Sequence, residues 1–411
     1  MRKRRRGMGK NKESFVNKNY ILMILINTLY TAAMGFATTH LTVHGTTELG
    51  MSMTLFGTIA SAYSVLCLVM RPISGNLVSR MNPKLIMMVS LGVATLSYLA
   101  FAISGNIPLF IMARIIQGIG FGMVGTCLPA LVAKSVPRAR YSQALGIYMT
   151  IPMITGIITP TIIVAAKDAL GYSFVCVIAA ICAVVAIVCT MLLKFDKVKE
   201  NENTERIKKE KKKFKLKEAI AIEAWPVVLA NIFCGICFTA IMMNLLVFDE
   251  KIGLGVFAVW MSLYNGCNMF TRALGGIVAD KIGSKKTLLI CMLCLAAGLA
   301  IFAFTESYVL WLAAAVIYAL GHGGFQAPMI SACVSCVEQD RAGVATGTMY
   351  MGADFGAIIA GTIVGILVDN LGYHNMYAVA MGCAVAAFVV LLAFFHPKET
   401  EENMESVKEA V

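Results

Sequence analysis

The sequence predicts an all-α membrane protein of twelve transmembrane helices, arranged as two parallel six-helix repeats. Three observations carry this prediction: apolar segments of helical length recur along the chain, basic residues are sorted between alternate loops, and the second half repeats the spacing of the first. Of the 411 residues, 58% are apolar and only 14% are charged. A soluble domain could not bury so much apolar surface, so the surrounding solvent is expected to be lipid.

Each apolar segment is long enough to cross a bilayer as a helix. A hydrocarbon core ~30 Å thick needs about 20 helical residues, and backbone polar groups that have no water partner require a helix. None of these segments shows the alternation of a membrane β-barrel. In chain order, the predicted spans are 20–43, 51–79, 83–104, 107–135, 140–166, 171–194, 219–248, 252–279, 285–305, 308–336, 341–368 and 373–396.

The positive charges are divided unequally between the two sides of the membrane. Of the 35 Lys and Arg residues, 30 lie before, after or between spans on one side, two lie in loops on the other side, and three lie within spans. This asymmetry predicts that both termini are cytoplasmic, in the inner or plasma membrane of a cell. The net charge of +12 therefore reflects topology, and we do not expect nucleic-acid binding.

The two halves are related by an internal repeat with an offset of 201 residues. The offset pairs Arg71 with Arg272 and Gly75 with Gly276, and the spacing between further pairs is unchanged. Six spans have therefore been duplicated in the same orientation. The predicted parts are an N-terminal half at 1–194, a linker at 195–218, a C-terminal half at 219–396 and a tail at 397–411. The basic linker is interpreted as a solvated cytoplasmic segment, with a surface helix on anionic lipid as the alternative.

Polar side chains are concentrated in every third predicted span. Spans 6, 9 and 12 carry almost none, which suits a lipid-facing position. Spans 1, 4, 7 and 10 carry Asn27, Arg114, Gln117, Asn231, His322 and Gln326. Since polar groups within a bilayer face protein or water, we expect these side chains to surround a wet central cavity, where they bind substrate or take part in proton coupling.

Asp354 is the only carboxylate that we place near the middle of the membrane. A buried carboxylate beside a cavity can take up and release a proton. We expect Asp354 to handle the proton or a cationic substrate, either protonated or paired with a cation such as His322 or Arg114; a purely structural hydrogen bond is the alternative. His322 is a second candidate for proton transfer. His40 and His44 are expected at the outer membrane interface.

The loop after span 2 and its repeat after span 8 carry a glycine-rich basic motif. Its elements are Arg71, Gly75, Ser79 and Arg80 in the first copy, and Arg272, Gly276, Asp280 and Lys281 in the second. In both places the sequence resembles the major facilitator superfamily, whose motif is G-x-L-x-D-R-x-G-R-[KR]. The resemblance implies a conformational latch on the cytoplasmic side, with Asp280 set against a helix N-terminus. Ser79 brings no charge, so we expect the first latch to be weaker. A basic turn with glycine packing is the alternative.

Span 4 contains Arg114-Ile-Ile-Gln117-Gly118-Ile-Gly120-Phe-Gly122. This segment is similar to the R-x-x-Q-G-x-G motif of the twelve-span drug:proton antiporter branch. The resemblance implies that Arg114 senses protonation or holds an anion; hydrogen bonding to carbonyls that stiffens the bundle is the alternative. The glycines are expected to pack helices closely. The branch also carries G-P-x-x-G in span 5, where this chain keeps Gly156 and Pro160 but has Thr159 and Ile163 at glycine positions.

These features predict a secondary transporter that works by alternating access. The favoured function is proton-coupled efflux of a small, amphipathic molecule, and uptake of a metabolite or organic anion with Arg114 as the anion site is the alternative. A membrane-embedded enzyme is disfavoured, because no nucleophile, metal or acid/base set clusters at one depth. The partners expected are a small-molecule substrate, protons and lipid, with the proton gradient in place of a cofactor and with a monomer as the unit. The 13 cysteines are expected to pack helices and not to bind metal.

Overall fold

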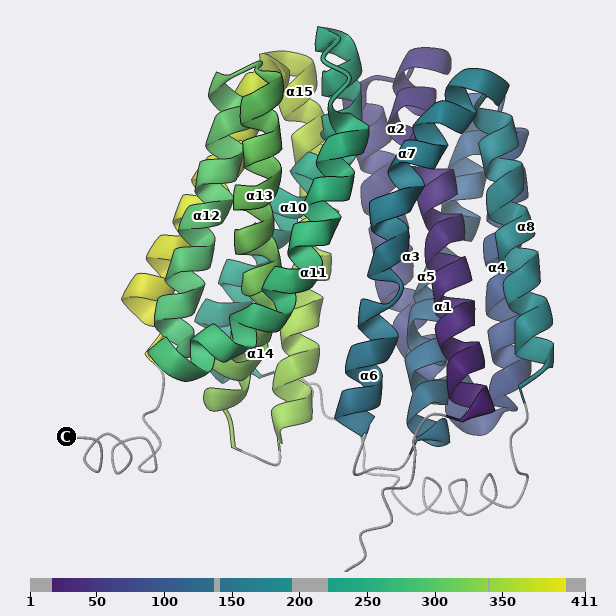
Figure 1. The fold of residues 1–411 in the computed structure, drawn as a ribbon, viewed down its shortest axis with the longest axis horizontal. Helices are drawn as coiled ribbons and strands as arrows, with labels where there is room; N and C mark the ends of the chain where they lie inside the picture. Colours follow the sequence, from purple (N-terminus) through teal and green to yellow (C-terminus); the bar gives the residue numbers. More distant parts are fainter. Residues whose placement is uncertain (1–16, 137–140, 194–220, 339–340, 397–411) are drawn as a thin grey trace, which may run out of the picture.

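The computed structural model describes residues 17–136, 141–193, 221–338 and 341–396. Figure 1 shows two helical bundles side by side, one for each half of the chain. The N-terminal half contains α1 (Lys18–Thr38), α2 (Leu41–Val43), the π-helix η1 (His44–Glu48), α3 (Met53–Arg80), α4 (Pro83–Ala102), α5 (Ile107–Ser135), α6 (Tyr141–Thr150), α7 (Met153–Leu170) and α8 (Tyr172–Met191). The C-terminal half contains η4 (Ile222–Ala224), α10 (Trp225–Ile252), α11 (Phe257–Ile282), α12 (Ser284–Phe304), α13 (Tyr308–Gly324), α14 (Gln326–Ser335) and α15 (Ala342–Phe394).

The predicted helical fold of two six-span repeats is confirmed. Ten of the described helices have the length and hydropathy of a membrane span. One of them, within α15, contains two predicted spans, which are separated where the backbone turns at Gly372 with φ of +80°. The remaining predicted span, 252–279, corresponds to α11. Span 1 is divided between α1 and α2 and continues beyond its predicted end into η1, span 5 is divided between α6 and α7, and span 10 between α13 and α14. The thirteen cysteines are free thiols.

Local sequence explains where several helices begin and end. Asn17, Ser52 and Asn106 each precede a helix, and their side-chain oxygens accept a hydrogen bond from a backbone N–H in its first turn. Lysine side chains satisfy carbonyl groups at helix C-termini: Lys84 donates to the carbonyl of Leu193, just after the end of α8. Lys285, the equivalent of Lys84 in the repeat, donates to the Leu392 carbonyl near the end of α15. The two halves therefore share this lysine contact at a helix C-terminus.

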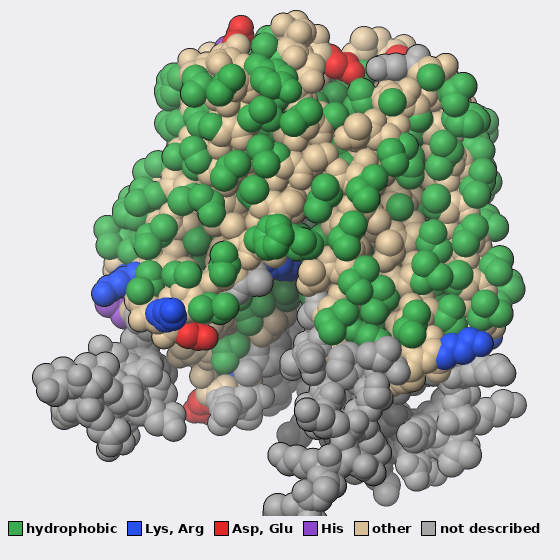
Figure 2. Space-filling model, viewed as in Figure 1, with side chains coloured by type: hydrophobic (Ala, Val, Ile, Leu, Met, Phe, Trp, Pro, Cys, Tyr) green, Lys and Arg blue, Asp and Glu red, His purple; other side chains and the backbone are tan. Residues whose placement is uncertain are grey.

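We call the end of the bundle where α1 begins the inner end, following the predicted topology, and the opposite end the outer end. Hydrophobic side chains cover the sides of the molecule in Figure 2, and most charged side chains lie at its two ends. The two halves meet where α3 packs against α15 and where α7 packs against α11. We call these contacts the α3–α15 seam and the α7–α11 seam.

Candidate functional site

Two adjoining cavities form the candidate site. The larger, of about 660 Å³, lies between the two halves and is lined by α1, α3, α5 and α7 from one side and by α10, α11 and α15 from the other. The smaller, of about 300 Å³, lies within the C-terminal half. Phe238, Thr239 and Ala357 line both. We call them the central cavity and the C-half cavity, and both have the size of small-molecule pockets.

The sequence-predicted polar residues divide between these cavities. Asn27 and Arg114, with Gly156 and Pro160, line the central cavity. Asn231, His322, Gln326 and Asp354 line the C-half cavity. Gln117 is 3% exposed and is hydrogen-bonded to Arg114. The structure thus has two adjoining cavities where a single one was expected, because side chains of α10 and α15 lie at the boundary.

The two asparagines make equivalent contacts in the two halves, although they lie 204 residues apart in the sequence and not 201. The Asn27 amide donates to the Tyr148 carbonyl at 3.1 Å, and the Asn231 amide donates to the Met349 carbonyl at 2.7 Å. Tyr148 and Met349 are separated by the repeat offset of 201. Asn27 therefore ties α1 to α6, Asn231 ties α10 to α15, and each asparagine also lines a cavity.

Arg114 lies on α5 at the edge of the central cavity. Its Nη1 donates to Gln117 Oε1 at 2.6 Å, and its Cζ lies 4.5 Å from the centre of the Tyr63 ring. The guanidinium is thus held by a neutral amide and an aromatic face. None of the ion pairs between described residues includes Arg114.

The glycines of span 4 bring α5 close to its neighbours. A Cβ on Gly118 would lie 3.0 Å from the Tyr63 carbonyl oxygen, and one on Gly122 would lie 2.7 Å from the Cys67 carbonyl oxygen, both on α3. A Cβ on Gly120 would lie 2.9 Å from a backbone nitrogen of α4. These distances explain how Arg114 comes to lie over Tyr63, because larger side chains would push α3 away.

Asp354 is paired with Arg71, a residue that the sequence assigned to the latch. Asp354 Oδ2 lies 2.7 Å from Arg71 Nη1, and Oδ1 lies 3.3 Å from Nη2. The expectation that His322 or Arg114 would be the partner cation is wrong, because α15 presents Asp354 to α3 across the seam. The two side chains are 24% and 39% exposed for Asp354 and Arg71, so this ion pair bridges the halves without being sealed from solvent.

His322 lies among aromatic side chains in the C-half cavity. Its Nδ1 is 2.8 Å from the Tyr264 hydroxyl, and its ring stacks on Phe238 at 4.8 Å. Asn268 Nδ2 donates to the Tyr264 hydroxyl and also lies 3.3 Å from His322 Nδ1. Because an amide nitrogen can only donate, Nδ1 is the acceptor in these contacts. A neutral His322 then carries its ring hydrogen on Nε2.

The predicted latch residues do not form one cluster. Asp280 and Lys281 are exposed, and Asp280 has no ion pair with the described residues. The side chains of Ser79 and Arg80 lie outside the described residues. A Cβ on Gly75 would lie 3.5 Å from Thr126, and one on Gly276 would lie 3.7 Å from Ala327. Arg71 and Arg272 lie instead at the two seams.

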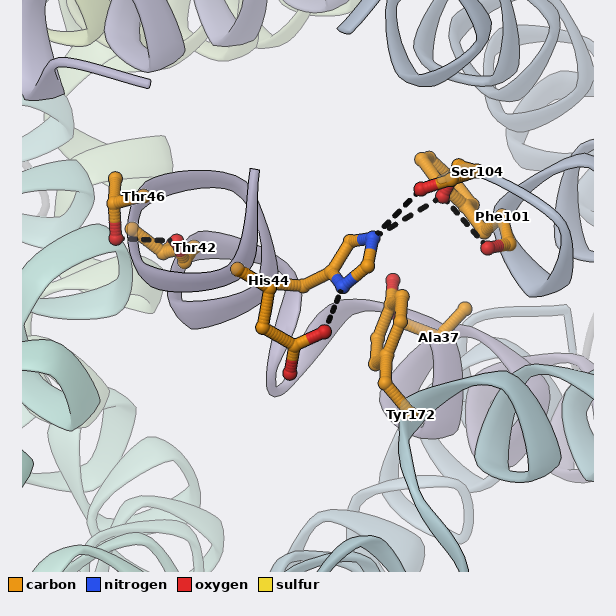
Figure 3. A network of polar contacts seen from close by, with 8 residues as sticks. Ala37, Thr42, His44, Thr46, Phe101, Ser104 and Tyr172 are labelled. Carbon is orange, nitrogen blue, oxygen red and sulfur yellow. Dashed lines mark hydrogen bonds and ion pairs between the residues drawn. The ribbon is translucent and has the colours of Figure 1, made fainter. Parts of the chain in front are cut away.

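Two outer-end features were missed by the sequence analysis. His40 and His44 lie at the outer end of span 1, and both are buried within the protein, with 2% and 8% exposure. His44 Nδ1 lies 2.6 Å from Glu48 Oε2, while Nε2 lies 3.0 Å from the Ser104 carbonyl oxygen. Figure 3 shows the His44 ring directed toward Ser104, with Tyr172 beside it. Because the Ser104 carbonyl can only accept, Nε2 carries the hydrogen in this contact. The i,i+4 spacing of His44 and Glu48 was the available signal.

Asp369 is the second missed feature. Its two carboxylate oxygens accept hydrogen bonds from the backbone N–H groups of Met53 at 3.0 Å and Thr54 at 2.7 Å. Asp369 thereby caps the N-terminus of α3 from the other half of the chain. It begins the repeated segment Asp-x-Leu-Gly-Tyr, which the sequence shows twice, but that pattern does not identify the helix that the carboxylate caps.

Comparisons with known proteins agree with this architecture. Residues 19–273 and 251–410 match the family model described as Major Facilitator Superfamily. Multidrug resistance protein 1 of Bacillus subtilis is 25% identical, and the match covers 90% of this chain and 96% of that protein. The uncharacterized MFS-type transporter Rv1250 of Mycobacterium tuberculosis is 27% identical over 28% of this chain and only 20% of its own length. The crystal structure of the nucleoside transporter NupG superposes with a TM-score of 0.75 at 13% identity, covering 93% of this chain and all of that one.

Proposed function

This chain belongs to the Major Facilitator Superfamily of secondary transporters, and we propose that it exports a small amphipathic molecule in exchange for protons. The ligand-sized cavity between the halves supports alternating access. The export direction is carried over from the relative named Multidrug resistance protein 1. In this proposal the chain works as a monomer in a cell membrane, with both termini in the cytoplasm, and the proton gradient is its energy source in place of a cofactor.

The observation that carries proton coupling is the ion pair between Arg71 and Asp354. It joins α3 to α15, which belong to different halves, and Asp354 also lines the C-half cavity. Protonation of Asp354 removes its negative charge, so the attraction between opposite charges is lost and only a hydrogen bond from the Arg71 guanidinium to the uncharged carboxyl group remains. The ion pair therefore stabilises the conformation in which this seam is closed, and proton binding releases it.

The expected size of this coupling follows from the partial exposure of the pair. An exposed ion pair contributes about 0.2–1 kcal/mol, whereas removing one partner of a fully buried pair costs about 3–5 kcal/mol. The exposures of 24% and 39% place this pair between those limits. A change of 1.4 kcal/mol alters a two-state population about tenfold, so one protonation can shift the balance between inward and outward forms.

His322 is the second group proposed for the proton path. It lines the same cavity as Asp354, and Tyr264 hydrogen-bonds to its Nδ1. Its remaining nitrogen, Nε2, is the atom that would exchange a proton with solvent in the cavity. His322 acts in this proposal as a relay between the cavity and Asp354, and not as the partner of the carboxylate.

The test is transport by purified protein in vesicles that contain a pH-sensitive dye, screened with a panel of amphipathic compounds. For a compound that moves protons, we expect Asp354→Asn to abolish accumulation driven by a pH gradient, because Asn cannot titrate. Equilibrium exchange should persist, and Asp354→Glu should retain part of the activity. Glu306→Gln is the matched control, because Glu306 pairs with His374 outside both cavities. Full gradient-driven accumulation by Asp354→Asn would reduce this residue to a structural hydrogen bond.

A further inference from the structure

The central cavity has an unusual charge distribution for a space of its size. Thirty residues line it, and Arg114 is the only one with a charged side chain. The rest are mainly apolar residues, hydroxyl residues and two asparagines. A ligand in this cavity therefore meets one positive charge and no negative charge from the residues that line it.

The neighbouring cavity does not supply a free negative charge either. Asp354 is the only acidic residue among those that line the C-half cavity, and it is already paired with Arg71. Within the described residues, Arg114 forms no ion pair. An arginine within a membrane span costs at least about 2.5–3.5 kcal/mol, so a counter-anion at Arg114 would be favourable.

Two hydrogen-bond donors beside this charge also have no acceptor. Arg114 Nε and Gln117 Nε2 are buried, and neither has a hydrogen-bond partner among the described residues. The Gln117 carboxamide oxygen accepts from Arg114 Nη1 and not from Nε. A buried donor without an acceptor costs about 1–3 kcal/mol. The guanidinium and the carboxamide thus share a need for acceptor oxygens.

We propose that Arg114 binds the oxyanion of an amphipathic organic anion in the central cavity, with Gln117 as the residue that positions the guanidinium, and that such anions are the class of substrate that the chain transports. A carboxylate has two acceptor oxygens and a negative charge, which match the planar guanidinium. The apolar part of the ligand lies against Phe121, Phe238 and Met242, which line the same cavity. This inference rests on the proposed function for the transport step, but not for binding.

The same arrangement disfavours a cationic ligand. A second positive charge in the cavity would be repelled by Arg114, and the low dielectric of the site strengthens that repulsion. The available carboxylate, Asp354, would have to leave Arg71 before it could bind a cation. An electroneutral amphipathic ligand would avoid the repulsion but would leave the charge of Arg114 without a counter-ion.

Three probes that share one ring system test the charge preference: 1-naphthoate, 1-naphthamide and 1-naphthylmethylammonium. Binding to the purified full chain in detergent is measured by equilibrium dialysis. We expect naphthoate to bind at least about tenfold more tightly than naphthamide, which corresponds to 1.4 kcal/mol, and the ammonium probe to bind most weakly. Equal binding of the three probes, no detectable naphthoate binding, or tightest binding of the ammonium probe overturns the inference.

Variants at Arg114 test whether this residue causes the preference. Arg114→Gln should reduce naphthoate affinity to that of naphthamide, while Arg114→Lys should keep part of the difference because it keeps the charge. Lys251→Gln is the control for a lost positive charge outside both cavities. Unchanged naphthamide binding shows that a variant is folded. If Arg114→Gln does not fold, Arg114→Lys carries the test: a naphthoate preference that is reduced but keeps the wild-type order of the three probes supports the inference, and an undiminished preference overturns it. A naphthoate preference that survives in folded Arg114→Gln assigns the anion to another site and overturns the inference.

Binding and coupling can fail separately. Dialysis requires no proton movement, so a naphthoate preference without pH-driven transport would uphold the anion site and reject the proposed coupling. Proton-driven transport of compounds with no preference for anions would reject the anion site and uphold the coupling.

Discussion

The α3–α15 seam and the α7–α11 seam occupy equivalent positions in the internal repeat, yet they are held together by different interactions. In the α3–α15 seam, Arg71 forms an ion pair with Asp354 at 2.7 Å. The offset of 201 relates these residues to Arg272 and Met153 of the α7–α11 seam. There, Arg272 Nη1 lies 4.0 Å from Met153 Sδ. The same arginine is therefore present in both seams, but its carboxylate partner is present in only one.

The remaining contacts extend this difference along both seams. The α3–α15 seam also contains the cap of Asp369 on α3. In the α7–α11 seam, Asn265 donates to the Gly156 carbonyl at 3.0 Å and Ser262 donates to the Ile157 carbonyl at 2.6 Å. A change in carboxylate protonation can therefore weaken the first seam but has no group to act on in the described contacts of the second. Among these described contacts of the two seams, the titratable ones thus belong to the α3–α15 seam.

The largest effect is expected where the α3–α15 seam is tightest. A Cβ on Gly57 would collide with the carbonyl oxygen of Gly361 across the seam. We expect Gly57→Ala to force the two helices apart and to lower the free energy of unfolding by about 1–3 kcal/mol, as overpacking does. Thermal unfolding in detergent measures this change. Gly92→Ala on α4 is the control, because a Cβ there meets no atom within 4 Å; equal melting of the two variants would show that the seam is not closely packed.

Sequence patterns predict features that depend on neighbouring residues, but they do not predict contacts between residues far apart in the chain, such as those that distinguish the two seams. The spans follow from hydropathy, and the polar residues that line the cavities follow from the cost of polar groups in lipid. The pair of Arg71 and Asp354 could not be predicted, because 283 residues separate its members and the packing of the two halves decides which side chains meet. The repeat did identify Arg71 and Arg272 as equivalent, but it does not show that only one of them meets a carboxylate.

A carboxylate can be introduced into the α7–α11 seam by a single substitution. Met153→Asp places an acid opposite Arg272, as Asp354 lies opposite Arg71. We expect a second inter-half ion pair with a coupling energy of about 0.5–3 kcal/mol, which would favour the closed α7–α11 seam and slow gradient-driven transport. The vesicle assay for the proposed function measures this rate.

Met153→Asn separates the charge from the change in side-chain shape. The Asn variant should transport at close to the wild-type rate, and adding Arg272→Gln to Met153→Asp should remove most of the inhibition. If Met153→Asp and Met153→Asn slow transport equally, the effect comes from lost methionine packing, and the absence of a carboxylate from this seam has no functional meaning.

The smallest effect concerns two helix caps. Asp369 caps α3 from the other half, whereas Asp249 at the end of α10 accepts from the backbone N–H groups of Val256 and Phe257 and so caps α11 within its own half. Replacing either aspartate with Asn removes the charge at the helix N-terminus while keeping one acceptor oxygen. At an exposed position such as Asp369 this costs about 0.3–1 kcal/mol.

Hydrogen–deuterium exchange distinguishes the consequences of the two caps. In Asp369→Asn, faster exchange should begin at the amides of Met53 and Thr54 and should include the outer end of the α3–α15 seam, because the lost contact joined the halves. In Asp249→Asn, faster exchange should be confined to the start of α11, since both members of that contact move with the same half. Exchange confined to the first turn of α3 in Asp369→Asn would make this carboxylate an ordinary helix cap, and closure of the seam would then depend on the ion pair and the glycine packing.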